Sequence, residues 1–139
     1  MLQQVHEHIT SELRQNTRTD TIFVVTAIAF NLIVLAINSS VASEASSYDP
    51  EASSDVILVV FIIMGLLINT IAVAGLNYGK NNRIKLIRGL LEMYKDNDVA
   101  KYYDESLLSA YGNRYLLFIG VIISLGLTGI IVPLVIRFV

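Results

Sequence analysis

Three long stretches without any charged residue constrain this chain most. Asp, Glu, Lys, Arg and His are all absent from residues 21–43, 56–79 and 115–136, which are 23, 24 and 22 residues long. A helix rises about 1.5 Å per residue, so about 20 residues cross a hydrocarbon core that is about 30 Å thick. Helices buried in soluble proteins rarely continue that far without a charge. We therefore predict an all-α integral membrane protein with three transmembrane helices.

Composition supports this fold class and excludes several classes of function. Of the 139 residues, 54% are hydrophobic and 16% are charged, so the apolar excess is expected to face lipid. The net charge of -2 offers no electrostatic footprint for nucleic acid. The chain has no cysteine, which excludes thiolate metal sites and cysteine nucleophiles. Neither a catalytic cluster nor a metal-binding or cofactor-binding motif is present, and we expect no enzymatic activity.

The distribution of basic residues predicts the orientation. The segment between the second and third spans holds seven of the ten: Lys80, Arg83, Lys85, Arg88, Lys95, Lys101 and Arg114. Arg14 and Arg18 precede the first span, and Arg137 lies beyond the third. Because basic residues are enriched on the cytoplasmic side, we expect the N-terminus inside and the C-terminus outside. The expected location is the plasma membrane of a prokaryote.

The chain divides into six segments on this basis. They are an amphipathic cytoplasmic segment (1–19), the first span (20–43), an acidic outer loop (44–55), the second span (56–79), a cytoplasmic helical hairpin (80–113), and the third span with a short outer C-terminus (114–139). The hairpin is inferred from apolar residues at helical spacing in its first arm, residues 80–95: Ile84, Ile87, Leu91 and Tyr94.

The second hairpin arm is expected over residues 99–111, with Asp98 as its N-cap. The hairpin then either projects into the cytoplasm as a continuation of the spans or folds back onto the membrane. Its apolar stripe, and the amphipathic N-terminal segment, need a surface to cover them. The stripe is therefore a candidate docking site for a partner.

Polar residues inside the spans are the candidate functional residues: Asn31, Asn38, Asn69, Ser124 and Thr128. Counted from the edges of the spans, Asn31, Asn69 and Ser124 lie at a similar level near the middle of the membrane. An amide is costly in hydrocarbon unless it finds a partner, so these side chains should face protein or water. They either hold helices together through hydrogen bonds or line a pore in an oligomer.

Small residues predict where helices approach closely. Gly75 and Gly79 form a GxxxG pair in the second span, and Gly120 begins a small-residue series with Ser124 and Thr128 in the third. Such faces serve contacts within one chain or between chains. Three helices alone bury little surface, so besides the lipid bilayer we expect either self-association or another membrane subunit as partner.

Two functions are consistent with these features. The first is a small oligomeric pore or channel-like assembly lined by the polar layer, with an acidic outer mouth of Glu44, Asp49, Glu51 and Asp55. The second is a non-conducting accessory or scaffold subunit of a larger membrane complex that docks partners through the hairpin. In that case the asparagines only join helices, and the acidic residues keep the outer loop solvated.

Overall fold

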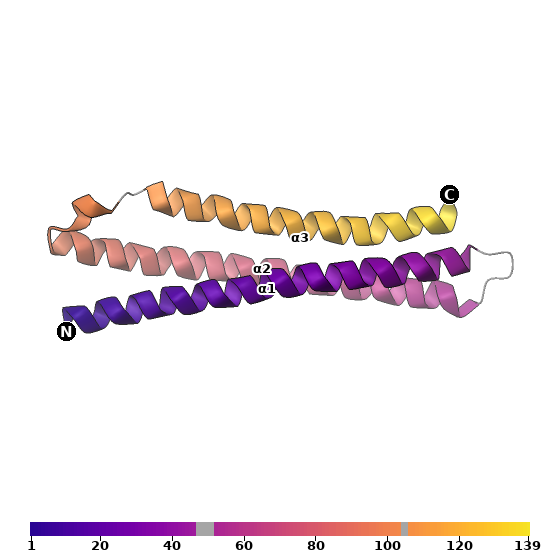
Figure 1. The fold of residues 1–139 in the computed structure, drawn as a ribbon, viewed down its shortest axis with the longest axis horizontal. Helices are drawn as coiled ribbons and strands as arrows, with labels where there is room; N and C mark the ends of the chain where they lie inside the picture. Colours follow the sequence, from indigo (N-terminus) through magenta and orange to yellow (C-terminus); the bar gives the residue numbers. More distant parts are fainter. Residues whose placement is uncertain (47–51, 104–105) are drawn as a thin grey trace.

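The computed structural model describes residues 1–46, 52–103 and 106–139 of the chain and is all-helical over them. Helix α1 comprises Leu2–Ala45, α2 comprises Ala52–Asp96 and α3 comprises Ser106–Phe138, with a 3₁₀ turn η1 at Ala100–Tyr102. The helices lie side by side in one elongated bundle, in which α1 and α3 run in the same direction and α2 in the opposite one (Figure 1). The N-terminus and the α2–α3 connection share one end of the bundle, and the C-terminus lies at the other.

All three helices are long and apolar enough to cross a membrane, which confirms an all-helical chain with three candidate spans. The helices have 44, 45 and 33 residues, well beyond the charge-free stretches. At about 1.5 Å per residue, α1 and α2 are more than 60 Å long, about twice the hydrocarbon thickness. The N-terminal segment is therefore not a separate element, because it continues into the first span as one helix.

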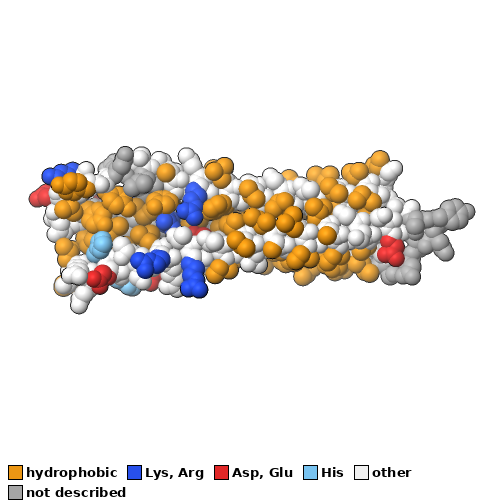
Figure 2. All heavy atoms as spheres, in the orientation of Figure 1, with side chains coloured by type: hydrophobic (Ala, Val, Ile, Leu, Met, Phe, Trp, Pro, Cys, Tyr) orange, Lys and Arg blue, Asp and Glu red, His pale blue; other side chains and the backbone are white. Residues whose placement is uncertain are grey.

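The surface of the spans is apolar in the way that lipid contact requires. Ile22, Ile71 and Leu116 are 58%, 63% and 67% exposed. On the face drawn in Figure 2, basic side chains gather over the half of the bundle that holds the N-terminus, and a broad apolar band covers the part beyond them. A contiguous apolar surface of this kind marks contact with a membrane or another protein.

The second arm of the expected hairpin begins later than predicted. The first arm is helical, since α2 continues to Asp96. It is followed by η1 at Ala100–Tyr102 and by the extended Tyr103, and α3 begins at Ser106. Asp98 has a left-handed φ of 58°. Its backbone N–H donates to Lys95 O and that of Val99 donates to Tyr94 O, the two bonds of a Schellman motif. Asp98 therefore terminates α2 instead of capping a following helix.

Helix α1 is the central element of the bundle, because it packs against α2 and α3 more extensively than they pack against each other. Its buried residues alternate at spacings of four and three: Asp20, Val24, Ala27, Asn31, Val34 and Asn38. An average spacing of 3.5 residues is the coiled-coil repeat, which keeps one seam facing its neighbours in a left-handed supercoil. Charged and amide residues thus occupy core positions of this seam.

Small residues on α2 let α1 approach it closely. Gly65, Ala72 and Gly79 follow each other at intervals of seven, and all three are buried. A Cβ atom added to Gly65 would lie 3.9 Å from Val34 Cγ1, an ordinary contact, whereas one added to Gly79 would overlap the carboxylate of Asp20. At the level of Gly79, the backbone of α2 therefore packs directly against the Asp20 side chain of α1.

Candidate functional site: buried polar residues of the bundle

The sequence-predicted polar layer is centred on a pair of amides, Asn31 on α1 and Asn69 on α2. Asn31 Nδ2 donates to Asn69 Oδ1 at 2.7 Å, and Asn69 Nδ2 donates back to Asn31 Oδ1 at 2.9 Å. Each Nδ2 also donates to a carbonyl of its own helix, Ala27 O and Gly65 O, both at 2.8 Å. Both hydrogens of each amide are thus used within one chain. The pair joins α1 to α2 and leaves no free donor for a ligand.

Packing from α3 closes this amide pair. A Cβ atom added to Gly126 would lie 2.8 Å from Asn69 Nδ2, closer than real Cβ contacts. Gly126 therefore provides the space that Asn69 occupies. Sequence reasoning did not select Gly126, because its role depends on the level that α3 takes against α2.

Asn38 lies one heptad beyond Asn31 on the same face of α1, and its surroundings are different. It is fully buried, and neither Nδ2 nor Oδ1 has a hydrogen-bond partner within the described residues. The Asp20–Tyr115 hydrogen bond fixes α1 and α3 at an offset of 95 residues. The same offset places Asn38 level with Pro133, another fully buried residue. Proline has no N–H to donate to the carbonyl of Gly129.

Ser124 and Thr128 do not join the amide layer. Both are exposed on the outer side of α3, and Thr128 Oγ1 donates to Ser124 O at 2.8 Å. Gly120 is exposed as well, with no atom within 4 Å of an added Cβ. The three small residues therefore form one outward face, which no other part of the described chain covers; we call it the α3 face.

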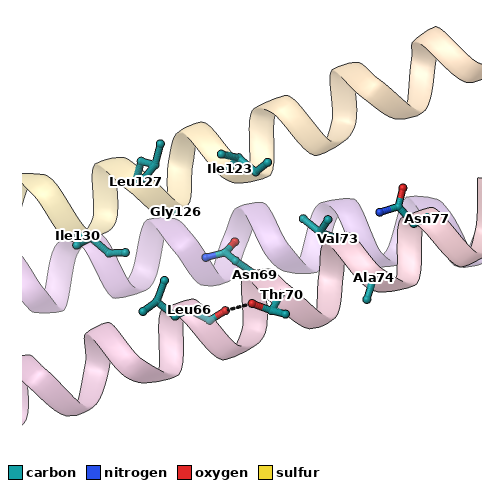
Figure 3. A pocket seen from close by; sticks show the side chains of 10 residues that line it. All are labelled: Leu66, Asn69, Thr70, Val73, Ala74, Asn77, Ile123, Gly126, Leu127 and Ile130. Atoms are coloured by element: carbon teal, nitrogen blue, oxygen red, sulfur yellow. Dashed lines mark hydrogen bonds between the residues drawn. The ribbon is translucent and has the colours of Figure 1, made fainter.

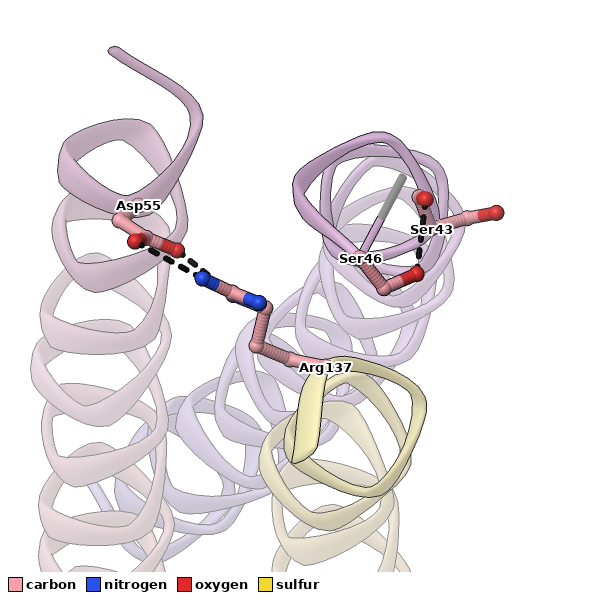
Figure 4. Close-up of polar contacts among 4 residues, drawn as sticks. All are labelled: Ser43, Ser46, Asp55 and Arg137. Carbon is pink, nitrogen blue, oxygen red and sulfur yellow. Dashed lines mark hydrogen bonds and ion pairs between the residues drawn. The ribbon is translucent and has the colours of Figure 1, made fainter. Parts of the chain in front are cut away.

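The acidic residues expected at an outer mouth have separate surroundings. Asp49 and Glu51 lie outside the described residues, and Glu44 is exposed. The carboxylate of Asp55, at the start of α2, accepts two hydrogen bonds from Arg137 on α3, Nε at 2.9 Å and Nη2 at 3.2 Å (Figure 4). In the same view Ser46 Oγ donates to Ser43 O at the end of α1. Asp55 thus links two helices instead of standing free.

The apolar stripe of the first hairpin arm is directed into the bundle. Ile87 is buried, Ile84, Leu91 and Tyr94 are half-buried, and the intervening Leu90 is buried too. The N-terminal part of α1 helps to cover this stripe, as the 2.9 Å hydrogen bond between His6 Nε2 and the Tyr94 hydroxyl shows.

Three aromatic rings pack together at this end of the bundle. The Tyr94 ring lies 5.8 Å from that of His6 and 5.4 Å from that of Tyr103, measured between centroids. Burial raises the pKa of the Tyr103 hydroxyl; the nearby Tyr111 and Tyr94 add to the rise, and Arg83 opposes it. The direction of this shift agrees with partial burial of Tyr103 among the neighbouring rings.

A second polar group lies at one end of the apolar spans, and Gly79 is the only one of its members that the sequence analysis names as a candidate site residue. We call it the boundary cluster and define it as Asn16, Thr17, Asp20, Gly79, Arg83 and Tyr115. The Tyr115 hydroxyl donates to Asp20 Oδ2, and Arg83 Nη1 donates to Thr17 Oγ1. Asp20, Arg83 and Tyr115 are all buried. The cluster therefore connects all three helices at one level.

Asn16 completes the boundary cluster. Its Nδ2 lies within hydrogen-bond distance of Gly79 O at 3.1 Å, Tyr115 Oη at 3.3 Å and Asp20 Oδ2 at 3.4 Å. The Arg83 guanidinium lies 4.3 Å from the centroid of the Tyr111 ring. A buried carboxylate needs hydrogen bonds and nearby positive charge, and this cluster supplies both.

The glycines of the GxxxG pair have different roles. Gly79 makes room for the Asp20 carboxylate, while an added Cβ on Gly75 would lie 3.2 Å from the Phe23 ring. Both therefore serve close approach of α1 within one chain. The sequence signal for the boundary cluster was the heptad phase, since Asp20 lies seven residues before Ala27 and shares the buried face with Asn31.

No group of three His, Cys, Asp or Glu residues able to hold a metal ion occurs in the parts of the chain that the structure describes. The chain matches no protein-family model, and comparisons with curated proteins and with solved structures return no similar protein. The fold and the buried polar groups thus define a class only: an all-helical protein with three helices suited to crossing a membrane.

Proposed function

We propose that this protein is a non-conducting structural subunit of a membrane assembly, built from further copies of itself or from another membrane protein. The observation that carries the proposal is the reciprocal Asn31–Asn69 pair, whose hydrogen-bonding groups are used inside one chain. Asn38 is fully buried in the same bundle. The Asn31–Asn69 pair acts as an interhelical contact, and the buried Asn31 and Asn38 do not face a path between subunits.

The α3 face is the surface that we assign to a neighbouring subunit. Gly120, Ser124 and Thr128 are exposed at intervals of four, the spacing that lets two membrane helices approach closely. The apolar stripe of the hairpin arm is turned inward, so a soluble partner would meet the outer, charged side of the arms. We place that end in the cytoplasm, because all of the ten basic residues except Arg137 lie in it or at its edge.

A pore remains the second candidate, and one observation favours it. Thr70, Asn77, Ser124 and Thr128 are polar residues exposed on the outer surface of the spans, where lipid alone would leave them without water. A ring of copies that enclosed these residues would have a polar lining. In that arrangement the lining comes from α2 and α3 and not from the asparagines of α1.

The test combines oligomer mass with ion flux. The purified protein in lipid discs should be oligomeric by native mass spectrometry, or retain a partner subunit, and give no ion flux in liposomes. Gly120→Ile should abolish the association without unfolding the chain, because nothing lies within 4 Å of an added Cβ. Flux from the unmodified protein would favour the pore, and a monomer without a partner would contradict both functions.

Gly89→Ile is the matched control. Gly89 is also exposed, helical and free of atoms within 4 Å of an added Cβ, but it lies on the arm of α2 beyond the span. This variant should assemble as the unmodified protein does.

The orientation is tested by cysteine labelling. Because the chain has no cysteine, single cysteines introduced at Asn97 and Ser46 can be labelled with a membrane-impermeant maleimide. Labelling of Asn97→Cys from the cytoplasmic side is expected.

A further inference from the structure

An outward-facing groove lies between α2 and α3, the two helices that pack least extensively on each other. It has a volume of about 430 Å³ and is lined by Leu66, Asn69, Thr70, Val73, Ala74, Asn77, Ile123, Gly126, Leu127 and Ile130. Figure 3 shows Leu66 and Ile130 at one end of it and Asn77 at the other. The bed of the groove is therefore aliphatic, with its polar residues on the α2 side.

Only one of these polar side chains is free to bind. Asn69 is engaged with Asn31, and Thr70 Oγ1 donates to Leu66 O at 2.7 Å. Asn77 is exposed and makes no side-chain hydrogen bond to the described residues. An amide within an apolar surface gains from a polar ligand at its own depth. The free amide thus lies at the end of the groove nearest the edge of the span.

Lys80 extends the same line of α2. Leu66, Thr70, Val73, Asn77 and Lys80 follow one another at spacings of four and three, so they share one side of the helix. A Cβ atom added to Gly112 would lie 4.0 Å from Lys80 Cε, so the stem of the lysine reaches across to the first turns of α3. Lys80 is half-buried and forms no ion pair with a described residue.

The length of this line matches one leaflet of a bilayer. Leu66 and Lys80 are separated by about 20 Å along the helix at 1.5 Å per residue, and the aliphatic bed occupies about 15 Å of it. Half of a hydrocarbon core of about 30 Å is also about 15 Å. A molecule with one leaflet-long apolar chain and an anionic group at the end would meet both the bed and the lysine.

We propose that the α2–α3 groove binds an anionic phospholipid. One acyl chain lies along Val73, Ala74, Ile123 and Leu127, and the phosphate receives hydrogen bonds from the Lys80 ammonium and the Asn77 amide. Basic groups at this depth attract anionic headgroups. This site does not depend on the proposed role as an assembly subunit, since it is complete within one chain.

A second copy of the chain fits the groove less well. Two copies inserted with the same orientation bring their Lys80 side chains to the same depth, where like charges repel across an apolar surface. Free phosphate has no apolar part that would pack against the aliphatic bed. Both remain outcomes that the experiment distinguishes.

The experiment measures retained lipid by native mass spectrometry of the purified protein in detergent. Mixed micelles contain phosphatidylglycerol or phosphatidylcholine with identical acyl chains. One phosphatidylglycerol should remain bound per chain, and Lys80→Ala should weaken its binding about tenfold, the effect of losing one charge-assisted hydrogen bond. Lys80→Arg should retain binding, and Lys85→Ala, an exposed lysine of the same arm, should have no effect.

A second variant tests the apolar bed without changing charge. Ala74→Phe places a ring in the groove at an exposed position and should displace the lipid, while circular dichroism reports that the helices remain. The proposal would be overturned if the two lipids were retained equally. It would also be overturned if Lys80→Ala retained phosphatidylglycerol as well as the unmodified protein does. Equal competition by inorganic phosphate, or a lipid-free dimer that Ala74→Phe dissociates, would overturn it as well. The native mass spectra also report the oligomeric state. A failure of the proposed assembly role is therefore distinguished from a failure of lipid binding.

Discussion

Asn31 and Asn38 are the same residue type, one heptad apart on the same buried face of α1, yet their environments are opposite. Asn31 exchanges two hydrogen bonds with Asn69 and uses its second amide hydrogen on its own helix. Asn38 is more deeply buried and has no partner among the described residues. A buried polar residue therefore specifies a helix contact only where the neighbouring helix offers a matching group at its level.

The largest difference is expected from removing the paired amide. Asn31→Leu leaves Asn69 Oδ1 without a donor in an apolar environment, and should lower the free energy of unfolding by about 1–2 kcal/mol. Unfolding by SDS in mixed micelles, followed by circular dichroism, measures this loss. An unchanged transition would show that the pair contributes nothing to stability.

The double variant Asn31→Leu, Asn69→Leu isolates the pairwise contribution. Because neither amide is then left without a partner, its cost should be smaller than the sum of the two single costs. Additive losses would mean that each asparagine acts through its own helix carbonyl and not through the other amide.

A smaller loss of stability is expected from a substitution on α3 at the level of the Asn31–Asn69 pair. Gly126→Ala places a Cβ 2.8 Å from Asn69 Nδ2, and the amide pair or α3 must shift, at a cost of about 1 kcal/mol. Gly89→Ala is the control, since an added Cβ there has nothing within 4 Å and Gly89 lies outside the α3 face. The SDS transition should move for Gly126→Ala only. Equal shifts for both variants would show that the effect comes from replacing a glycine in a helix and not from contact with the Asn69 amide.

The smallest effect is expected at the unpaired amide. Asn38→Leu removes a buried polar group that has no described partner, so the unfolding free energy should stay within about 0.5 kcal/mol or rise. The same SDS titration measures it. A loss as large as that of Asn31→Leu would show that Asn38 does have a partner, and the carbonyl of Gly129, freed by Pro133, would be the first to examine.

The sequence predicts the spans well because a charge-free stretch as long as a membrane is thick is rare in soluble helices. Counting along the helices also predicts that Asn31 and Asn69 lie at one level of the bundle, where they are paired. It does not predict which side of a helix faces a neighbour. Asn31 and Ser124 were expected at a similar level, yet one is buried between helices and the other is exposed on the α3 face.

The boundary cluster illustrates the second limit. Asp20 is the last charge before the first apolar stretch, a position that usually marks the end of a span. Its burial depends on Tyr115, 95 residues further along the chain, and on the absence of a side chain at Gly79. Pairings over such separations arise from the register of three helices, which no local pattern contains. The start of the second hairpin arm differs from the prediction for a local reason, because Asp98 takes a left-handed φ at the end of α2 instead of capping a following helix.

The order in which polar partners occur along the chain has a consequence for biogenesis. Asn31 and Asn69 are both made before α3 begins, so the first two helices can satisfy these amides as soon as both have entered the membrane. Asp20 has no access to Tyr115 until the third span is synthesised. A chain arrested after α2 would therefore already hold the hydrogen-bonded Asn31–Asn69 pair, while the Asp20 carboxylate would lack its Tyr115 partner. That difference identifies arrival of the last helix as the step that completes the protein.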